Sequence, residues 1–331
     1  MTQPVVLVTG STVSTEAQKL LRAAGLDIVF TGKSIDEQSV LSEVSRRTVP
    51  AVLLRGPAAF TSKVFAAAKD LRIISKHGVG IDSVDLASAT EHGVAVMITS
   101  GTNAEAVGEH ALALMLALTR ELPQFDRLVR AGKWKDQTYI VRDFSERTVG
   151  IVGYGSIGKR TAALAAACGA KVVVHSRTRG EPPPGMEWEE SLDRLLGRVD
   201  IVSLHCPLTE QTRGMIGAKQ LALMKPDALL INTSRGKLID EPALVAALKE
   251  GRLAGAGLDV YATEPPDPAN PLFALTNVLL TPHISSTTTH AAALMGVIAA
   301  KNIICYLRGE IYDRSNFINP QVFKGSDAVT R

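Results

Sequence analysis

The sequence predicts an α/β protein with two domains, each built on a doubly wound parallel sheet. Two observations favour this class. Short apolar runs alternate with helical stretches twice along the chain, first over residues 5–98 and again from residue 148 onward. The chain also has 331 residues, which is more than one hydrophobic core usually organises.

The first series of elements lies at the start of the chain. Short apolar runs of this kind are typical of buried parallel strands, and the stretches between them are typical of crossover helices. The expected strands include Val5–Val8, Ala51–Leu54 and Leu71–Ser75, and the expected helices include Thr15–Ala24 and Thr61–Ala68.

A cluster of turn-forming residues, Thr99 to Asn103, closes the first series. Asn103 is predicted to cap a long apolar helix that runs to about Leu122, because asparagine is a preferred N-cap residue. We expect this helix to link the two domains.

The second series contains six expected strands, which predicts a doubly wound sheet. A second turn-rich junction, Ser285 to Thr289, follows it, and a helix is expected from His290 to Leu307. The segment after this junction is too short for a third domain, so we expect it to pack on the first. The six strands are Thr148–Val152, Lys171–His175, Ile201–Leu204, Ala228–Asn232, Gly255–Val260 and Val278–Thr281.

The first turn of the second series has the pattern G-x-G-x-x-G. It follows an apolar strand, opens an alanine-rich helix and is followed by a second strand, which is the context of a dinucleotide-binding turn. Gly153 makes the turn, Gly155 lets a pyrophosphate approach the backbone, and Gly158 lets helix and strand meet. The alternative is a purely structural turn.

The residues after the second strand bear on the choice of cofactor. An acidic residue usually stands there and holds the ribose 2′-hydroxyl of NAD, but this chain has Ser176. Arg177 and Arg179 follow and suit the 2′-phosphate of NADP. We therefore expect NADP to be preferred over NAD. The alternative is that both arginines are solvated loop charges and that either cofactor is used.

Three polar side chains follow late strands, at the sheet edge where α/β proteins place ligands. Arg235 can hold a substrate carboxylate bidentately and polarise the neighbouring carbonyl. Glu264 beside His283 can orient the imidazole and raise its pKa, keeping a proton available near neutral pH. Taken singly, each has an ordinary structural explanation, but their joint position favours catalysis. The other histidines are assigned structural roles: His77, His92, His110, His175, His205 and His290.

Composition limits the possible partners. The 36 basic and 33 acidic side chains give a formal net charge of +3, which provides no footprint for nucleic acid or an anionic membrane. The apolar runs Ala111–Leu118 and Ala291–Ala300 are shorter than a membrane span and are expected to be buried helices. Three scattered cysteines favour neither disulfides nor a metal site. The N-terminus has no signal-peptide pattern, so a cytoplasmic location is expected.

At this point the chain resembles the D-isomer-specific 2-hydroxyacid dehydrogenase family, close to its phosphoglycerate dehydrogenase and hydroxypyruvate/glyoxylate reductase branches. The resemblance covers nearly the whole chain, and its motifs occur in the family's order. They are Lys76-His77-Gly78-Val79-Gly80-Ile81-Asp82, Gly153–Gly158, His205-Cys206-Pro207-Leu208-Thr209, Asn232–Gly236, Asp259-Val260, Glu264-Pro265 and Pro282-His283.

The resemblance implies a role for each matching residue. His283 is implied as the acid/base, Glu264 as its partner, and Arg235 as the ligand of the substrate carboxylate and carbonyl. The backbone N–H groups of Val79 and Gly80 are implied to bind the same carboxylate. The residues implied to line the cofactor site are Ser156, Ile157, Cys206, Pro207, Thr233 and Asp259, the last near the nicotinamide carboxamide.

The resemblance also implies the domain organisation. One lobe is flavodoxin-like and discontinuous, comprising residues 1–100 plus 285–331, and is expected to bind the substrate. The Rossmann lobe, residues 101–284, is expected to bind NAD(P). In this family the long helix after Asn103 belongs to a dimer contact, so a homodimer is expected.

The expected activity is hydride transfer between NAD(P)H and a small 2-oxo acid, namely hydroxypyruvate, glyoxylate or 3-phosphohydroxypyruvate. Arg55 resembles a phosphate contact of phosphoglycerate dehydrogenases, but it can equally select hydroxypyruvate by charge. Ser176 departs from the usual phosphoglycerate dehydrogenase pattern, and no regulatory serine-sensing domain is expected. Two alternatives stay open: a phosphoglycerate dehydrogenase proper that uses NAD, and a corepressor-like protein that senses NAD(H).

Overall fold

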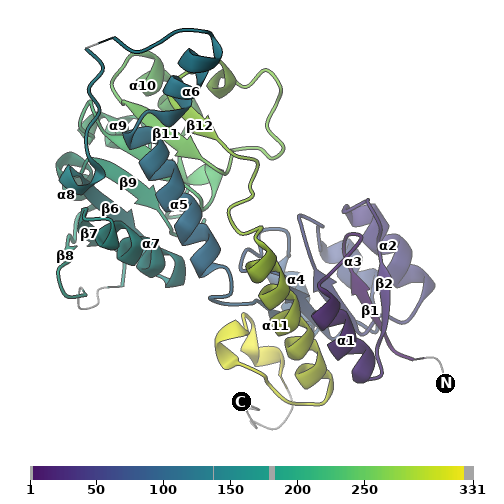
Figure 1. Cartoon of the computed structure of the whole chain (residues 1–331). Coiled ribbons are helices and arrows are strands. Elements are labelled where there is room, and N and C mark those ends of the chain that lie inside the picture. Colours follow the sequence, from purple (N-terminus) through teal and green to yellow (C-terminus); the bar gives the residue numbers. More distant parts are fainter. Residues whose placement is uncertain (1–2, 137, 179–182, 324–331) are drawn as a thin grey trace. The chain divides into compact units, whose positions relative to one another are not determined.

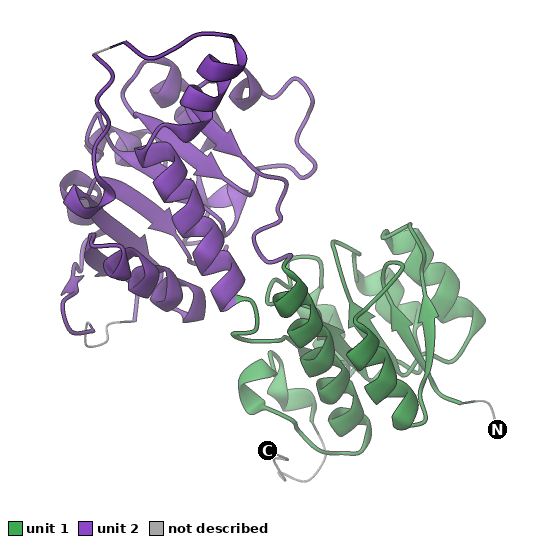
Figure 2. Ribbon diagram, in the orientation of Figure 1, with its two compact units in different colours: residues 1–103, 288–331 green, residues 104–287 purple. Residues whose placement is uncertain are grey.

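The computed structural model describes residues 3–136, 138–178 and 183–323, and the chain divides into two compact units (Figures 1 and 2). Unit 1 comprises residues 1–103 and 288–331, and unit 2 comprises residues 104–287. Unit 1 is therefore discontinuous in sequence, with unit 2 inserted between its two segments.

The sheet of unit 1 contains β1 (Val5–Val8), β2 (Asp27–Phe30), β3 (Ala51–Leu54), β4 (Ile73–Lys76) and β5 (Ala95–Met97). All neighbouring strands are parallel, and their order is β2-β1-β3-β4-β5. This is the flavodoxin-like order of a doubly wound sheet. The carboxyl ends of β3 and β4 carry Arg55 and the loop His77–Gly80.

Helices cover both faces of this sheet. One face packs against α1 (Thr15–Ala23) and α11 (Thr289–Leu307), with Leu21 and Ile303 in the core. The other face packs against α2 (Glu37–Arg46), α3 (Ser62–Ala67) and α4 (Leu86–Glu91). Because both faces are buried, the strands consist almost entirely of apolar residues.

Helix α11 returns the chain from unit 2 to unit 1. In the described residues it is long and apolar enough to cross a bilayer by length and composition, and at 19 residues it exceeds the apolar run that predicted it. In this structure it packs closely on α1: a Cβ at Gly296 would lie 2.7 Å from Ser14 Oγ. Downstream, Asn319 Oδ1 accepts a 2.8 Å hydrogen bond from Val96 N in β5. The segment after α11 includes η4 (Arg314–Asn316) and η5 (Pro320–Val322).

The sheet of unit 2 contains β6 (Thr148–Val152), β7 (Lys171–His175), β8 (Glu187–Trp188), β9 (Ile201–Leu204), β10 (Leu229–Asn232), β11 (Gly255–Leu258) and β12 (Val278–Leu280). Its order is β12-β11-β10-β9-β6-β7-β8, again fully parallel. The order reverses at β6, which is the switch point where doubly wound sheets bind ligands. The two-residue edge strand β8 was not predicted.

The helices of unit 2 also form two layers. One face packs against α5 (Ala104–Thr119) and α7 (Ser156–Ala167), and the other against α8 (Leu192–Arg198), α9 (Ala218–Leu223) and α10 (Glu241–Lys249). The shorter elements are α6 (Leu122–Arg130), η1 (Phe144–Glu146), η2 (Gly236–Leu238) and η3 (Pro271–Ala274). The carboxyl ends of β10, β11 and β12 carry the three predicted catalytic residues.

Two details of the linking helix differ from the sequence prediction. The helix α5 ends at Thr119, because Glu121 adopts a left-handed conformation (φ 51°) and a new helix, α6, begins at Leu122 with Pro123 in its first turn. Asn103 directly precedes α5, but its Oδ1 is buried without a hydrogen-bond partner among the described residues. Asn103 therefore occupies the predicted N-cap position, but its Oδ1 accepts no capping hydrogen bond from any described residue.

Candidate active site

The dinucleotide turn has the geometry that its glycines predict. Gly153 has φ 97°, and a Cβ there would lie 2.7 Å from Cys206 N. A Cβ at Gly158 would lie 2.0 Å from Gly153 O, so only glycine lets α7 start this close to the strand. Gly155 faces open space instead, directly before the N-terminus of α7. Ser156 and Ile157 are the first residues of that helix, whose free N–H groups and dipole favour an anion.

The position that distinguishes NAD from NADP lies beside this turn. Strands β6 and β7 pair in register up to Val152 and His175, and Gly153 N donates a 2.8 Å hydrogen bond to His175 O. Ser176 follows directly and is half-buried, while Arg177 is exposed. Arg179 lies outside the described residues. The turn is thus adjacent to a serine and an arginine, with no acid at residue 176.

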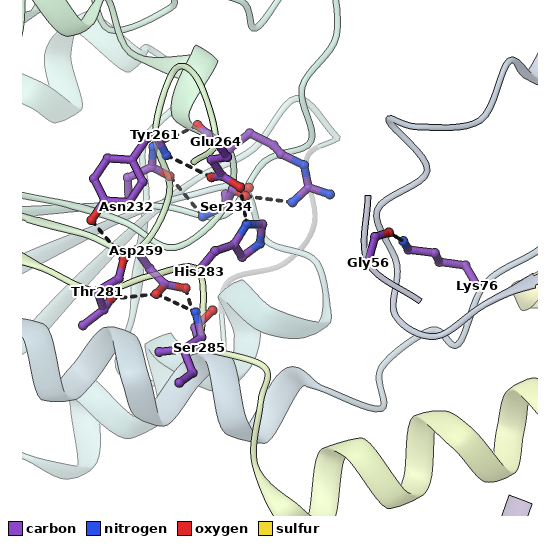
Figure 3. Close-up of polar contacts among 12 residues, drawn as sticks. Gly56, Lys76, Asn232, Ser234, Asp259, Tyr261, Glu264, Thr281, His283 and Ser285 are labelled. Carbon is purple, nitrogen blue, oxygen red and sulfur yellow. Dashed lines mark hydrogen bonds and ion pairs between the residues drawn. The ribbon is translucent and has the colours of Figure 1, made fainter. Parts of the chain in front are cut away.

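His283 and Glu264 form a pair. The Nδ1 atom of His283 lies 2.6 Å from Glu264 Oε2, and Figure 3 shows the ring and the carboxylate facing each other. The Glu264 hydrogen bond and charge raise the pKa of His283 above its ordinary value. Desolvation opposes ionisation of Glu264, but hydrogen bonds from His283 and from Tyr261 N bring its pKa below the ordinary value. The pair therefore favours an imidazolium next to a carboxylate.

A buried carboxylate holds the backbone around His283. Asp259 is fully buried, its Oδ1 accepts from Ile284 N at 2.9 Å, and its Oδ2 accepts from Ser285 N at 2.9 Å. His283 N also donates to the carbonyl oxygen of Asp259 at 2.8 Å. His283 has φ 51°, a left-handed conformation that costs energy for a residue other than glycine. The three backbone hydrogen bonds that Asp259 accepts hold residues 283–285 in this conformation.

Sequence reasoning missed two members of this cluster. Thr281 Oγ1 donates to Asp259 Oδ1 at 2.6 Å, and His110 Nε2 lies 3.0 Å from Thr281 Oγ1 and 3.7 Å from Asp259 Oδ1. Despite burial of Asp259, the hydrogen bonds from Thr281 and the two backbone amides lower its pKa. His110 comes from α5, 171 residues before Thr281, so no local pattern links them.

Arg235 lies in the loop after β10. Its Nη1 donates to Ser234 O at 2.7 Å, and its carbonyl oxygen accepts from Asn232 Nδ2 at 2.9 Å. Its positive charge acts on both Glu264 and His283, lowering the pKa of each. The next residue must be glycine, because a Cβ at Gly236 would lie 2.0 Å from the carbonyl carbon of Tyr261. The arginine loop thus packs directly on the backbone that leads to Glu264.

The remaining predicted cofactor residues follow strands β9 and β10. Cys206 is partly buried, and desolvation raises the pKa of its thiol to about 11, so it is a neutral packing group. Pro207 follows it in the same loop. Thr233 is buried, and its Oγ1 has no partner among the described residues. An unpartnered hydroxyl, the open space at Gly155 and the start of α7 fit a polar dinucleotide well.

The predicted substrate residues of unit 1 lie on the loops after β3 and β4. Arg55 Nη1 donates to the carbonyl oxygen of Thr12, and burial lowers the pKa of its guanidinium. Val79 and Gly80 are half-buried and follow Gly78, whose N–H donates to Thr99 Oγ1 at 2.9 Å. His77 precedes them, and burial together with the charge of Arg55 lowers its pKa to about 4. The structural role assigned to His77 agrees with its contact to Ala292 O.

Comparisons with known proteins cover most of the chain. Residues 112–285 match the family described as D-isomer specific 2-hydroxyacid dehydrogenase, NAD binding domain. A glyoxylate reductase of Korarchaeum cryptofilum is 43% identical over 270 residues, which is 80% of each chain. A D-3-phosphoglycerate dehydrogenase of Archaeoglobus fulgidus is 37% identical over 302 residues, which is 90% of this chain and 56% of the relative.

Solved structures give the same result for the fold. One similar structure is an NADPH-dependent glyoxylate/hydroxypyruvate reductase from Sinorhizobium meliloti in complex with NADP and malonate. It is 28% identical, has a TM-score of 0.82, and the match covers 99% of this chain and 100% of the other. Both sheets and the helical layers of the present chain therefore occur together in known dehydrogenases.

Proposed function

The chain belongs to the D-isomer specific 2-hydroxyacid dehydrogenase family, and from this premise we propose that it reduces a small 2-oxo acid to the D-2-hydroxy acid with NADPH. The observation that carries the proposal is the 2.6 Å contact between His283 Nδ1 and Glu264 Oε2. It supplies an acid/base group whose pKa is raised above its ordinary value by the Glu264 carboxylate, beside an arginine suited to a carboxylate.

Each catalytic residue has a separate task in the proposed reduction. Arg235 binds the substrate carboxylate and polarises the neighbouring carbonyl. Protonated His283 donates its Nε2 proton to the carbonyl oxygen, because its Nδ1 proton is held by Glu264. A bound nicotinamide cofactor supplies the hydride for the keto carbon. In the reverse direction neutral His283 takes the proton from the hydroxy acid.

The preference for NADP rests on the residues after β7. Ser176 cannot repel a 2′-phosphate as an acid would, and exposed Arg177 can donate charge-assisted hydrogen bonds to it. The Sinorhizobium meliloti relative is described as NADPH-dependent, which supports the same choice. Arg179 is proposed as a second phosphate ligand from the sequence alone.

The proposed substrates are hydroxypyruvate, glyoxylate and 3-phosphohydroxypyruvate. The names of the relatives cover glyoxylate, hydroxypyruvate and phosphoglycerate. Arg55 decides among them in our proposal, because its tethered guanidinium on unit 1 favours a substrate with a polar or anionic group beyond the carboxylate. Backbone N–H groups of Val79 and Gly80 are proposed to bind the carboxylate itself.

We also propose that the protein forms a homodimer in the cytoplasm and binds neither nucleic acid nor membranes. The support for the dimer is a series of exposed apolar side chains along α6 and the segment after it: Leu122, Val129, Trp134, Tyr139 and Ile140. Trp134 and Ile140 are 78% and 88% exposed, which is costly unless another surface covers them. Light scattering should give twice the chain mass, and aspartate at both positions should shift the protein toward monomer.

An initial-rate assay tests the proposed activity. Glyoxylate, hydroxypyruvate and 3-phosphohydroxypyruvate are each supplied with NADPH or NADH, and oxidation of the cofactor is followed at its absorbance maximum. The highest kcat/KM is expected with NADPH. Turnover of only the phosphorylated substrate with NADH would identify a phosphoglycerate dehydrogenase. Tight cofactor binding without turnover of any 2-oxo acid would identify a redox sensor instead.

A further inference from the structure

A carboxylate outside the predicted site joins both ends of the loop that carries Glu264. Glu241 is the first residue of α10 and is half-buried. Its Oε2 accepts a 3.0 Å hydrogen bond from Ala262 N, and its Oε1 accepts a 2.8 Å hydrogen bond from Asn270 Nδ2. One side chain therefore closes the segment 262–270, called here the glutamate loop.

The glutamate loop has no buried residue along its length. It lies between two buried anchors, Tyr261 and Leu272, but its own residues are exposed or half-buried. A solvent-open pocket of about 370 Å³ lies between part of this loop and Glu241. The pocket is lined by Glu241, Ala262, Thr263, Pro266, Asp267, Ala269, Asn270 and Pro271. The two hydrogen bonds to Glu241 thus hold a loop that has no buried residues of its own.

The fixed end of this loop adjoins the acid/base pair. Tyr261 N, one residue before Ala262, donates to Glu264 Oε1 at 3.0 Å, while Glu264 Oε2 faces His283. Gly236 packs directly on the same Tyr261–Ala262 peptide, and Glu241 accepts a hydrogen bond from Ala262 N, so two contacts restrict the backbone there. A shift of Ala262 would carry Tyr261 N, and with it the Glu264 carboxylate, away from the imidazole.

We propose that Glu241 is a positioning residue, whose carboxylate fixes the glutamate loop and thereby holds Glu264 against His283. The inference rests on the proposed function, in which Glu264 and His283 form the acid/base pair. Glu241 itself touches neither of them, so its effect on the reaction is exerted through Ala262 and Asn270.

The test compares Glu241→Ala with a matched control on the same helix. Asp240 is the N-cap of α10 and accepts from Ala243 N at 3.1 Å, so Asp240→Ala weakens the helix start but leaves both loop contacts in place. Loss of two hydrogen bonds to a charged group should lower kcat about tenfold or more in Glu241→Ala. In Glu241→Ala the reduction rate should also begin to fall at a lower pH than in the wild type, while KM for NADPH should stay unchanged. Asp240→Ala should keep the pH profile of the wild type.

Two further variants guard against a general folding defect. Glu241→Gln keeps the shape of the side chain but can accept only one of the two bonds, so an intermediate pH shift is expected. Asn270→Ala should shift the profile in the same direction, and the double variant Glu241→Ala/Asn270→Ala should add little to Glu241→Ala, because Glu241→Ala already removes the contact to Asn270. A wild-type pH profile in Glu241→Ala, or an equal shift in Asp240→Ala, would overturn the proposal.

Hydrogen exchange separates this inference from the proposed function. The Ala262 amide should exchange faster in Glu241→Ala than in the wild type or Asp240→Ala, whether or not the protein turns over a 2-oxo acid. Absence of turnover in the wild type would reject the proposed function alone. Unchanged exchange at Ala262 would reject the positioning role of Glu241.

Discussion

Glu264 Oε2 lies 2.6 Å from His283 Nδ1, which leaves Nε2 as the ring atom that can exchange a proton with a substrate. We expect His283→Ala to lower kcat for reduction at least about 100-fold, because general acid catalysis contributes on that scale. NADPH affinity, measured by fluorescence titration, should stay within a factor of two to three of the wild type. His290→Ala, which removes an exposed histidine at the start of α11, is the control. Wild-type turnover in His283→Ala would remove His283 from the mechanism.

Replacement of Glu264 by glutamine should change the pH profile more than the rate. The Glu264 carboxylate raises the pKa of His283, and reduction requires the protonated ring. The rate therefore falls as the pH rises through that pKa, and in Glu264→Gln this fall should lie at lower pH. Asp267→Asn is the matched control, because Asp267 is in the same loop and its Oδ1 accepts from Ala269 N. An identical profile for Glu264→Gln and the wild type would show that Glu264 is not the partner.

Arg235→Lys keeps the positive charge but loses the planar, two-pronged donor. We expect a higher KM for the 2-oxo acid and also a lower kcat, because both the carboxylate and the polarised carbonyl lose a contact. Steady-state kinetics with hydroxypyruvate measure both parameters. If neither changes, the substrate carboxylate is bound elsewhere.

The cofactor preference should depend on the two residues after His175. Arg177→Ala should weaken NADPH binding roughly tenfold and leave NADH binding nearly unchanged, since one charge-assisted hydrogen bond is worth about 1.5–3 kcal/mol. Ser176→Asp should reverse the preference by repelling the 2′-phosphate. Ratios of kcat/KM for the two cofactors measure both effects. If the wild type has equal kcat/KM for NADPH and NADH, and Arg177→Ala weakens the binding of both alike, Arg177 is a solvated surface charge.

Acid should destabilise the protein through a buried histidine that the mechanism does not use. Burial lowers the pKa of His205 from 6.5 to about 4, and its Nδ1 has no partner among the described residues. The unfolded chain therefore takes up a proton that the folded state excludes, so the free energy of unfolding should fall as the pH drops from 6.5 to 4. The full effect is about 3 kcal/mol. Urea titrations at pH 7 and pH 4.5 measure it, and His205→Asn should show a smaller difference. If the free energy of unfolding changes equally with pH in His205→Asn and in the wild type, His205 is not the cause.

Much of the fold could be predicted because each buried strand is a compact apolar run. Strands β1, β3, β6, β7 and β9 occupy the predicted residues. The edge strand β8 has only two residues, too few for any periodic pattern. The break between α5 and α6 was missed because it depends on the backbone of Glu121, whose left-handed conformation no composition rule predicts. Asn103 occupies the predicted position before α5, but its buried Oδ1 makes no capping bond to a described residue, a detail that residue type alone does not predict.

In the candidate site, too, local patterns could be predicted and tertiary contacts could not. Glu264 and His283 could be paired from the sequence, because β11 and β12 are adjacent parallel strands and their carboxyl ends lie at one sheet edge. The contacts of His110 and Glu241 could not be predicted from the sequence. His110 reaches Thr281 from a helix 171 residues away, and Glu241 reaches Ala262 across 21 residues that include a strand. Such contacts depend on how layers pack, which leaves no mark in a local motif.

The insertion of unit 2 within unit 1 has a consequence for protein synthesis. The seven strands of unit 2 leave the ribosome as one uninterrupted segment. The five-stranded sheet of unit 1, in contrast, emerges before the helix α11 that covers one of its faces. Leu21, Leu53 and Met97 belong to the core on the α11 face of that sheet and stay partly uncovered until residues 289–307 are made. At 5–20 residues per second, the roughly 200 intervening residues keep this apolar surface exposed for roughly 10–40 s. The nascent chain should therefore be a substrate for chaperones that bind apolar segments near the ribosome.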